Sequence, residues 1–401
     1  MTPLSAGGGG SEEPPPTRRI PWHRAATLTS VLAAALLLSP GSRAQSFTDP
    51  EDGALDMSEF MIDYKGFLPV PLLITEPAVG YGGGLGLIFV RNSLRERQEE
   101  GKQSGHVTPP DVFGAFFAAT ENGTKFAAVG GMFSFGEDDR WRYRGGIGRV
   151  DANLDFYGVG GQLGNGDRSI GFNLNGWASS QQGLLRLGDS NHYLALRWIY
   201  LDLRVTFDPT RPEPAFAPRS RTLTSSGVGP SLEHDSRDNI FTPNRGWQGA
   251  IDALFYSPEI SSDNRFQTYR AHAFVYTPFG RDFVLGTRLD ARAARGDVPF
   301  YQLPFIDIRG VPKGRYQDEN VSVLEGELRW NATPRWALIG FFGGGRAWGL
   351  QERFGEANTV FAGGAGFRYL IARRLGIYMG LDVARGPDET AFYIQVGGAW
   401  R

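Results

Sequence analysis

The sequence predicts an all-β fold, a transmembrane antiparallel β-barrel of sixteen strands, and three observations predict it. Apolar and polar residues alternate with a period of two through most of the chain after residue 79, as in strands with one apolar face. The predicted strands are about 10–14 residues long, enough to cross a bilayer at a tilt. Tryptophans gather near predicted strand ends, as in the aromatic girdles of membrane barrels: Trp141, Trp330, Trp336, Trp348 and Trp400.

The N-terminal residues predict export. A basic stretch is followed by the apolar run 25–39 and then by a small-x-small site that ends at Ala44, which is the order of a signal peptide. The run is shorter than the roughly 20 residues of a membrane-spanning helix. We therefore predict a signal peptide over 1–44, cleaved near Ala44. A short, acidic and flexible periplasmic lead-in over 45–66 then leads into a barrel over 67–401.

Strand alternation shows which kind of β protein to expect. In the stretch 320–330, Leu324, Leu328 and Trp330 share one face, and Glu325, Glu327 and Arg329 share the other. A soluble sandwich or propeller also alternates, with its polar face toward water. The length and number of the strands favour a barrel in the outer membrane of a Gram-negative bacterium.

The strand count follows from parity. Fifteen strands can be placed directly, at 79–90, 109–120, 123–136, 141–153, 170–187, 191–208, 221–235, 245–257, 265–278, 281–295, 320–332, 335–347, 358–371, 375–386 and 391–400. A bacterial barrel has an even number of strands and both ends in the periplasm. If the long loop Asp307–Asp318 is extracellular, an odd number must precede it. One strand is therefore hidden, in the proline-broken stretch 67–75 or within 170–208. This gives eleven strands before the loop and five after it.

Four stretches together resemble the BamA/TamA superfamily of outer-membrane barrels, also called bacterial surface antigen barrels. They are L-E-H-D-S-R-D-N-I-F-T-P-N-R-G-W at Leu232–Trp247, I-R-G-V at Ile308–Val311, E-L-R at Glu327–Arg329 and G-A-G-F-R at Gly364–Arg368. Their order and spacing carry the resemblance, which covers roughly residues 65–401. The residues 45–66 are too few for a POTRA domain, so the chain looks like a barrel-only member.

The resemblance implies that the loop around Ile308, Arg309, Gly310 and Val311 is a lid folded into the lumen. In the family, the lid arginine pairs with acids on the inner wall. Glu327 lies on the polar face of the next strand, and Arg–carboxylate pairs are strong in confined sites. The family's usual second partner is an Asp where this chain has Gly343. Glu327 is therefore the expected partner of Arg309, with Asp382 as a further candidate; a solvated Arg309 is the alternative.

Two other sets of residues follow from the resemblance. Asp235, Arg237, Asp238, Pro243 and Gly246 resemble the family's turn motif, and we favour a structural, salt-bridged turn over a functional one. The first and last strands of the barrel are expected to meet in a weak lateral seam. We place this seam at Val79, Gly80, Gly82, Phe392 and Trp400.

The implied function is insertion or translocation of protein or lipid at the outer membrane. The implied partners are outer-membrane lipids, unfolded client proteins, periplasmic chaperones and a second copy of the chain. One alternative is a pore-forming or structural barrel that is gated or plugged by the Arg309 loop, without insertase activity. Another is a surface protein that binds through its extracellular loops.

Composition argues against other classes of protein. The chain has no Cys, which excludes disulfides, thiolate metal sites and a Cys nucleophile. Its five His residues are scattered, no Ser stands in a G-x-S-x-G elbow, and the glycines near Gly82 open no helix. A net charge of −2 gives no electrostatic reason for binding nucleic acid. We predict no enzyme activity, no cofactor and no metal site.

Overall fold

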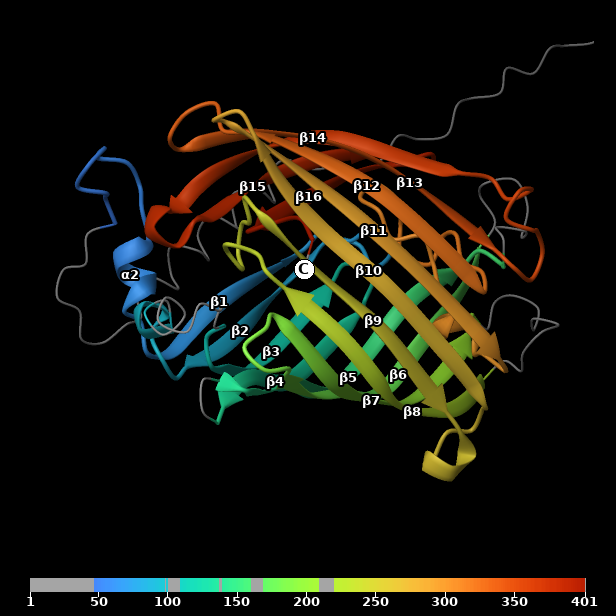
Figure 1. Cartoon of the computed structure of the whole chain (residues 1–401). Helices are drawn as coiled ribbons and strands as arrows, with labels where there is room; N and C mark the ends of the chain where they lie inside the picture. The colour runs from blue at the N-terminus through green and yellow to red at the C-terminus, as the bar shows by residue number, and fades with distance from the viewer. Residues whose placement is uncertain are drawn as a thin grey trace, which may run out of the picture. The chain divides into compact units, whose positions relative to one another are not determined.

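The computed structural model describes residues 47–97, 99, 109–136, 139–159, 169–208 and 220–400. Within them, sixteen strands form one antiparallel sheet in which each strand pairs with its neighbours in chain order, and the sheet curls into a barrel (Figure 1). The predicted signal peptide lies outside the described residues. No described helix is long and apolar enough to cross a membrane.

The elements have the following bounds. The strands are β1 (Gly66–Ile74), β2 (Gly82–Val90), β3 (Val112–Thr120), β4 (Lys125–Phe135), β5 (Trp141–Phe156), β6 (Ile170–Arg186), β7 (His192–Phe207), β8 (Ser220–Asp235), β9 (Gly246–Tyr256), β10 (Phe266–Phe279), β11 (Phe283–Gly296), β12 (Asn320–Trp330), β13 (Trp336–Trp348), β14 (Val360–Ala372), β15 (Ile377–Arg385) and β16 (Thr390–Val396). The short helices are α2 (Ser58–Ile62), η3 (Pro258–Ile260), η4 (Phe300–Gln302) and η5 (Arg373–Leu375).

The predicted number of strands is confirmed, with eleven before the β11–β12 loop and five after it. The hidden strand is β1, which carries Pro69 and Pro71. Proline lacks the N–H that a ladder needs, so within sheets it is confined to edges and bulges. This matches the position of β1 at one edge of the sheet.

The two faces of the sheet differ as predicted. On β12, Leu324 and Leu328 are 55% and 39% exposed, whereas Glu325 is 2% exposed. The outer face is thus apolar and the inner face is polar, which is the reverse of a soluble protein and fits a barrel in lipid. The assignment of Trp400 to the aromatic girdle is wrong. β16 ends at Val396, and beyond it Trp400 is buried among Phe274, Tyr276 and Val284 inside the barrel.

The sheet has two free edges, because the described residues of β1 and β16 form no ladder with each other. The strands at these edges are short, with nine residues in β1 and seven in β16. The strands β5 to β8, by contrast, have 16 or 17 residues.

The position predicted for the N-terminal side of the seam is corrected. Gly82 lies on β2, which pairs with both β1 and β3, and Val79 and Gly80 precede it in a turn. The prolines of β1 had obscured the true first strand. Phe392 does lie on the edge strand β16, whereas Trp400 lies beyond it.

The lead-in was expected to be flexible, but residues 47–63, here called the N-terminal strap, are fixed to the barrel. Arg335, in the β12–β13 turn, contacts Asp52 and Asp56 at 2.6 Å each and also contacts Asp49. Arg373 of η5 contacts Asp49 at 3.0 Å. The acidic residues that suggested flexibility are therefore partners of buried or half-buried arginines. We call this end of the barrel the strap end, and the opposite end, with the β11–β12 loop, the loop end.

Candidate functional site

The β11–β12 loop, residues 297–319, packs by apolar contacts against two sections of the inner wall. Near its start, the Phe300 ring lies 4.9 Å from the Phe156 ring and 5.0 Å from the Phe172 ring, centroid to centroid. Further along, Ile306, Ile308 and Val311 are buried in one cluster with residues of β12 and β14. These contacts hold the loop across the barrel at its loop end.

Arg309 lies at the centre of the loop's polar contacts. Its guanidinium lies 2.9 Å from Glu325, 2.7 Å from Glu327 and 2.9 Å from Asp382, and its side chain is 9% exposed. Burial alone would lower the pKa of Arg309, but the three carboxylates outweigh this effect and raise it. The ring of Phe341 packs 3.6 Å below the guanidinium carbon, a cation–π contact.

The structure thus brings Arg309 to Glu327 and also to Asp382, which lies far along the chain on β15. Sequence reasoning missed Glu325, although it shares a face with Glu327. Glu325 pairs across the ladder with Gly343, and a Cβ added there would meet the Glu325 Cβ at 3.0 Å. The glycine at the position of the family's usual Asp therefore leaves room for the glutamate. Only the register of β12 against β13, which the sequence does not give, places Glu325 opposite Gly343.

The three carboxylates belong to a larger charge network on the inner wall. Asp382 also binds Arg368 at 2.6 Å, and Glu325 lies 3.5 Å from Arg288 and accepts a 3.0 Å hydrogen bond from the Trp400 indole. Five arginines face five acids in this network, so it is neutral overall: Arg270, Arg288, Arg292, Arg309 and Arg368, with Asp290, Asp307, Glu325, Glu327 and Asp382.

The loop contacts both sides of the seam. The Gly310 N–H donates to the Tyr393 hydroxyl of β16 at 2.9 Å, and Lys313 lies 3.5 Å from Glu76 in the β1–β2 turn. Gly310 has a φ of +94°, which favours glycine. It packs so closely on the β15–β16 turn that a Cβ on Gly386 would lie 2.0 Å from its carbonyl oxygen.

The family-like turn motif lies at the strap end, between β8 and β9. Asp235 accepts two hydrogen bonds from Arg237, at 2.9 and 2.7 Å. Asp238 accepts hydrogen bonds from the backbone N–H groups of residues 244 and 245, and Gly246 has a φ of +94°. Pro243 lies near the C-terminal residues, 3.7 Å from where a Cβ on Gly398 would stand. Each of these contacts is local turn chemistry or packing.

Comparison with known proteins reveals similar folds among solved structures. BamA of Haemophilus ducreyi lacking POTRA domains 1–3 superposes with a TM-score of 0.57 at 11% identity, over 83% of this chain and 70% of that one. CdiB of Escherichia coli gives 0.54 at 14% identity, over 82% and 61%. CdiB of Acinetobacter baumannii gives 0.52 at 12% identity, over 82% and 59%. The aligned region thus covers about three-fifths of each CdiB chain.

No family model matches the sequence, and no curated protein matches it. The structural likeness establishes the fold, an outer-membrane type of sixteen-stranded barrel resembling that of BamA.

Proposed function

We propose that this barrel lies in the outer membrane of a Gram-negative bacterium and inserts or translocates protein or lipid there. The observation that carries the proposal is the seam, where β1 and β16 are both edge strands with no ladder between them. An edge strand presents free N–H and C=O groups on which another strand can pair. Partners of such a seam are membrane lipids and unfolded client chains delivered by periplasmic chaperones.

In this proposal, the β11–β12 loop is a lid that holds the lumen and the seam in one arrangement. Its supporting contacts are the Arg309 ion pairs on the wall and the bonds of Gly310 and Lys313 to opposite sides of the seam. Release of Arg309 from the wall would free both sides of the seam from the loop together.

The test measures folding of a client barrel into phosphatidylethanolamine–phosphatidylglycerol vesicles that contain the full chain. We expect faster client folding than in empty vesicles. Because the chain has no Cys, Val70→Cys on β1 and Gln395→Cys on β16 provide unique thiols for a bridging bismaleimide. Bridging should abolish the acceleration, and the two single-Cys variants, treated identically, are the controls. Correctly folded protein that never accelerates the client, or that does so equally when bridged, contradicts the proposal.

A further inference from the structure

The luminal faces of β1 to β4 are apolar, whereas the lumen of a membrane barrel is ordinarily polar. The register of the ladders identifies the inner positions, because directly paired residues share a face. On β1 these positions are Leu68, Val70, Leu72 and Ile74, all of them half-buried. On β2, β3 and β4 the inner positions carry glycine, alanine or larger apolar side chains, except for Thr120 and Ser134 near the two ends. No inner position of these four strands is charged.

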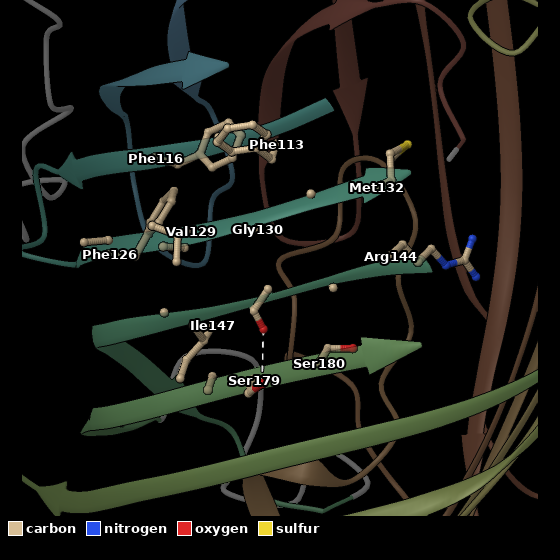
Figure 2. Close-up of a pocket in the computed structure, with 18 of the residues that line it drawn as sticks. Phe113, Phe116, Phe126, Val129, Gly130, Met132, Arg144, Ile147, Ser179 and Ser180 are labelled. Carbon is tan, nitrogen blue, oxygen red and sulfur yellow. Dashed lines mark hydrogen bonds between the residues drawn. The ribbon is translucent and has the colours of Figure 1, made fainter. Parts of the chain in front are cut away.

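Part of this apolar face lies in a cavity of about 810 Å³ against β2 to β7. Its lining includes the inner side chains of Phe116 and Phe126, which Figure 2 shows on neighbouring strands, with Gly130 further along β4. Gly130 stands in register between Gly114 on β3 and Gly146 on β5, so the inner face is hollow at this level. Outer-facing side chains also line the cavity, because a sheet without side chains on one face is thin there. An apolar concavity is typical of a ligand site.

The lid and the charge network lie against other parts of the wall. Phe300 of the lid packs on Phe156 and Phe172, whereas Ile306 and Val311 are buried with residues of β12 and β14. The charged side chains of the network stand on β10, β11, β12, β14 and β15 and on the lid. The lumen therefore has two unlike halves, a polar one that holds the lid arginine and an apolar one beside the β1 edge of the seam.

The apolar luminal face is continuous with the lipid-facing surface around the free edge of β1. On the outer face of this strand, Phe67 and Leu73 are 58% and 36% exposed. On its inner face, Val70 and Leu72 stand beside glycines of β2, which have no side chains to cover them. β1 has no strand on its far side in the described sheet. A single strand thus separates the two apolar surfaces, and a hydrocarbon chain that rounds its edge stays in apolar contact throughout.

The chemistry of this face suits an acyl chain better than a polypeptide. A client strand of a membrane barrel turns its polar side chains toward the lumen; paired on β1, it would place them beside Leu68, Val70 and Leu72. A polypeptide lying across β2 to β4 would bury its amides without partners, because both ladders of each of these strands are already filled. An acyl chain has no amides to satisfy, and its burial against apolar side chains is favourable.

We propose that the luminal face of β1 to β4 binds the acyl chains of a phospholipid from the surrounding bilayer, which round the free edge of β1. The chains lie against Val70 and Phe116 and over Gly130. This inference deepens the proposed function, since it assigns lipid as the class of substrate, and it rests on that function only for a seam that is open to the membrane. The two are tested separately: a barrel that never accelerates client folding leaves this inference standing, and water on the luminal face overturns it whatever the result for client folding.

Site-directed spin labelling of the full chain in phosphatidylethanolamine–phosphatidylglycerol vesicles tests the proposal. Because the chain has no Cys, Ala128→Cys carries a single nitroxide on the inner face of β4. Ala115→Cys, on the outer face of β3 and outside the cavity lining, is the lipid reference, and His272→Cys, beside Asp290 on the polar wall, is the luminal reference. Collisions of each nitroxide with oxygen, which concentrates in hydrocarbon, are compared with its collisions with a water-soluble nickel chelate. We expect the ratio for Ala128→Cys to match that for Ala115→Cys and to exceed that for His272→Cys several-fold.

The same measurement identifies any other occupant. A ratio equal to that for His272→Cys means that water covers the face, and few collisions with either reagent mean that a segment of the chain itself covers it; either result overturns the proposal. Adding Leu72→Asp to Ala128→Cys charges the inner face at the β1 edge and should lower the ratio several-fold, while Leu72→Met should leave it unchanged. A ratio that Leu72→Asp does not alter contradicts entry around β1. Heat-modified migration in gels selects folded protein, and Ala128→Cys alone decides the proposal if Leu72→Asp does not fold.

Discussion

Replacing Arg309 with Ala should destabilise the barrel far more than removal of a surface charge. The side chain is 9% exposed and its carboxylate partners Glu325 and Asp382 are 2% and 0% exposed. Glu325 and Asp382 keep Arg288 and Arg368 as partners, but Glu327 loses its ion pair, and the neutral network acquires one uncompensated negative charge. Breaking a buried pair from one side costs about 3–5 kcal/mol, which is the expected loss in unfolding free energy.

Urea unfolding in vesicles, followed by tryptophan fluorescence, measures this loss. The matched control is Arg265→Ala, which removes an ion pair with Glu259 in which both side chains are about two-thirds exposed; it should cost less than about 1 kcal/mol. Adding Glu327→Gln to Arg309→Ala restores neutrality and should recover about 1–2 kcal/mol. A loss for Arg309→Ala no larger than that of the control would refute the idea that Arg309 anchors the loop.

Three further predictions follow from the same contacts. Arg335→Ala should release the N-terminal strap, and limited proteolysis should then cut within residues 47–57, which the wild-type chain protects. The hydrogen bond with Arg335 lowers the pKa of Asp52 to about 2, so docking of the strap favours the charged carboxylate. Hydrogen exchange should therefore show a docked strap above about pH 4 and weaker docking as the pH falls toward 2. Docking that does not change with pH would contradict this prediction. Gly386→Ala places a Cβ 2.0 Å from the Gly310 carbonyl oxygen and should lower the unfolding free energy by about 1–3 kcal/mol, whereas Gly355→Ala, where a Cβ meets nothing within 4 Å, should change it little.

The period-two alternation was enough to predict the barrel and fifteen of its strands, because each face of a strand meets one environment; the even number of strands in a bacterial barrel then supplied the division into eleven and five. What the alternation does not contain is the register between strands distant in sequence. Asp382 could therefore be named only as a candidate partner of Arg309, and Glu325 was not named at all, although both stand on the predicted polar faces. The period also misled where the chain leaves the sheet: it placed Trp400 on the outer face, but β16 ends at Val396 and the indole turns inward to Glu325.

Composition misled at the N-terminal strap for a related reason. A short acidic segment with few apolar residues resembles a disordered lead-in unless its partners are known. Those partners, Arg335 and Arg373, lie about 280 to 320 residues away in turns that gave no signal of their own.

These separations bear on the order in which the chain folds. Every ladder of the described sheet joins strands adjacent in sequence, so the sheet has low contact order for its size and can grow hairpin by hairpin. The strap instead closes a loop of some 280 residues when Asp52 meets Arg335, and Lys313 meets Glu76 across 237 positions. Such contacts cannot form until β12 and its turns are in place. Only then can their ion pairs offset the entropy lost when so long a stretch of chain is closed into a loop. Strap docking should accordingly be among the last events of folding, because the strap can bind only to a barrel that is already complete.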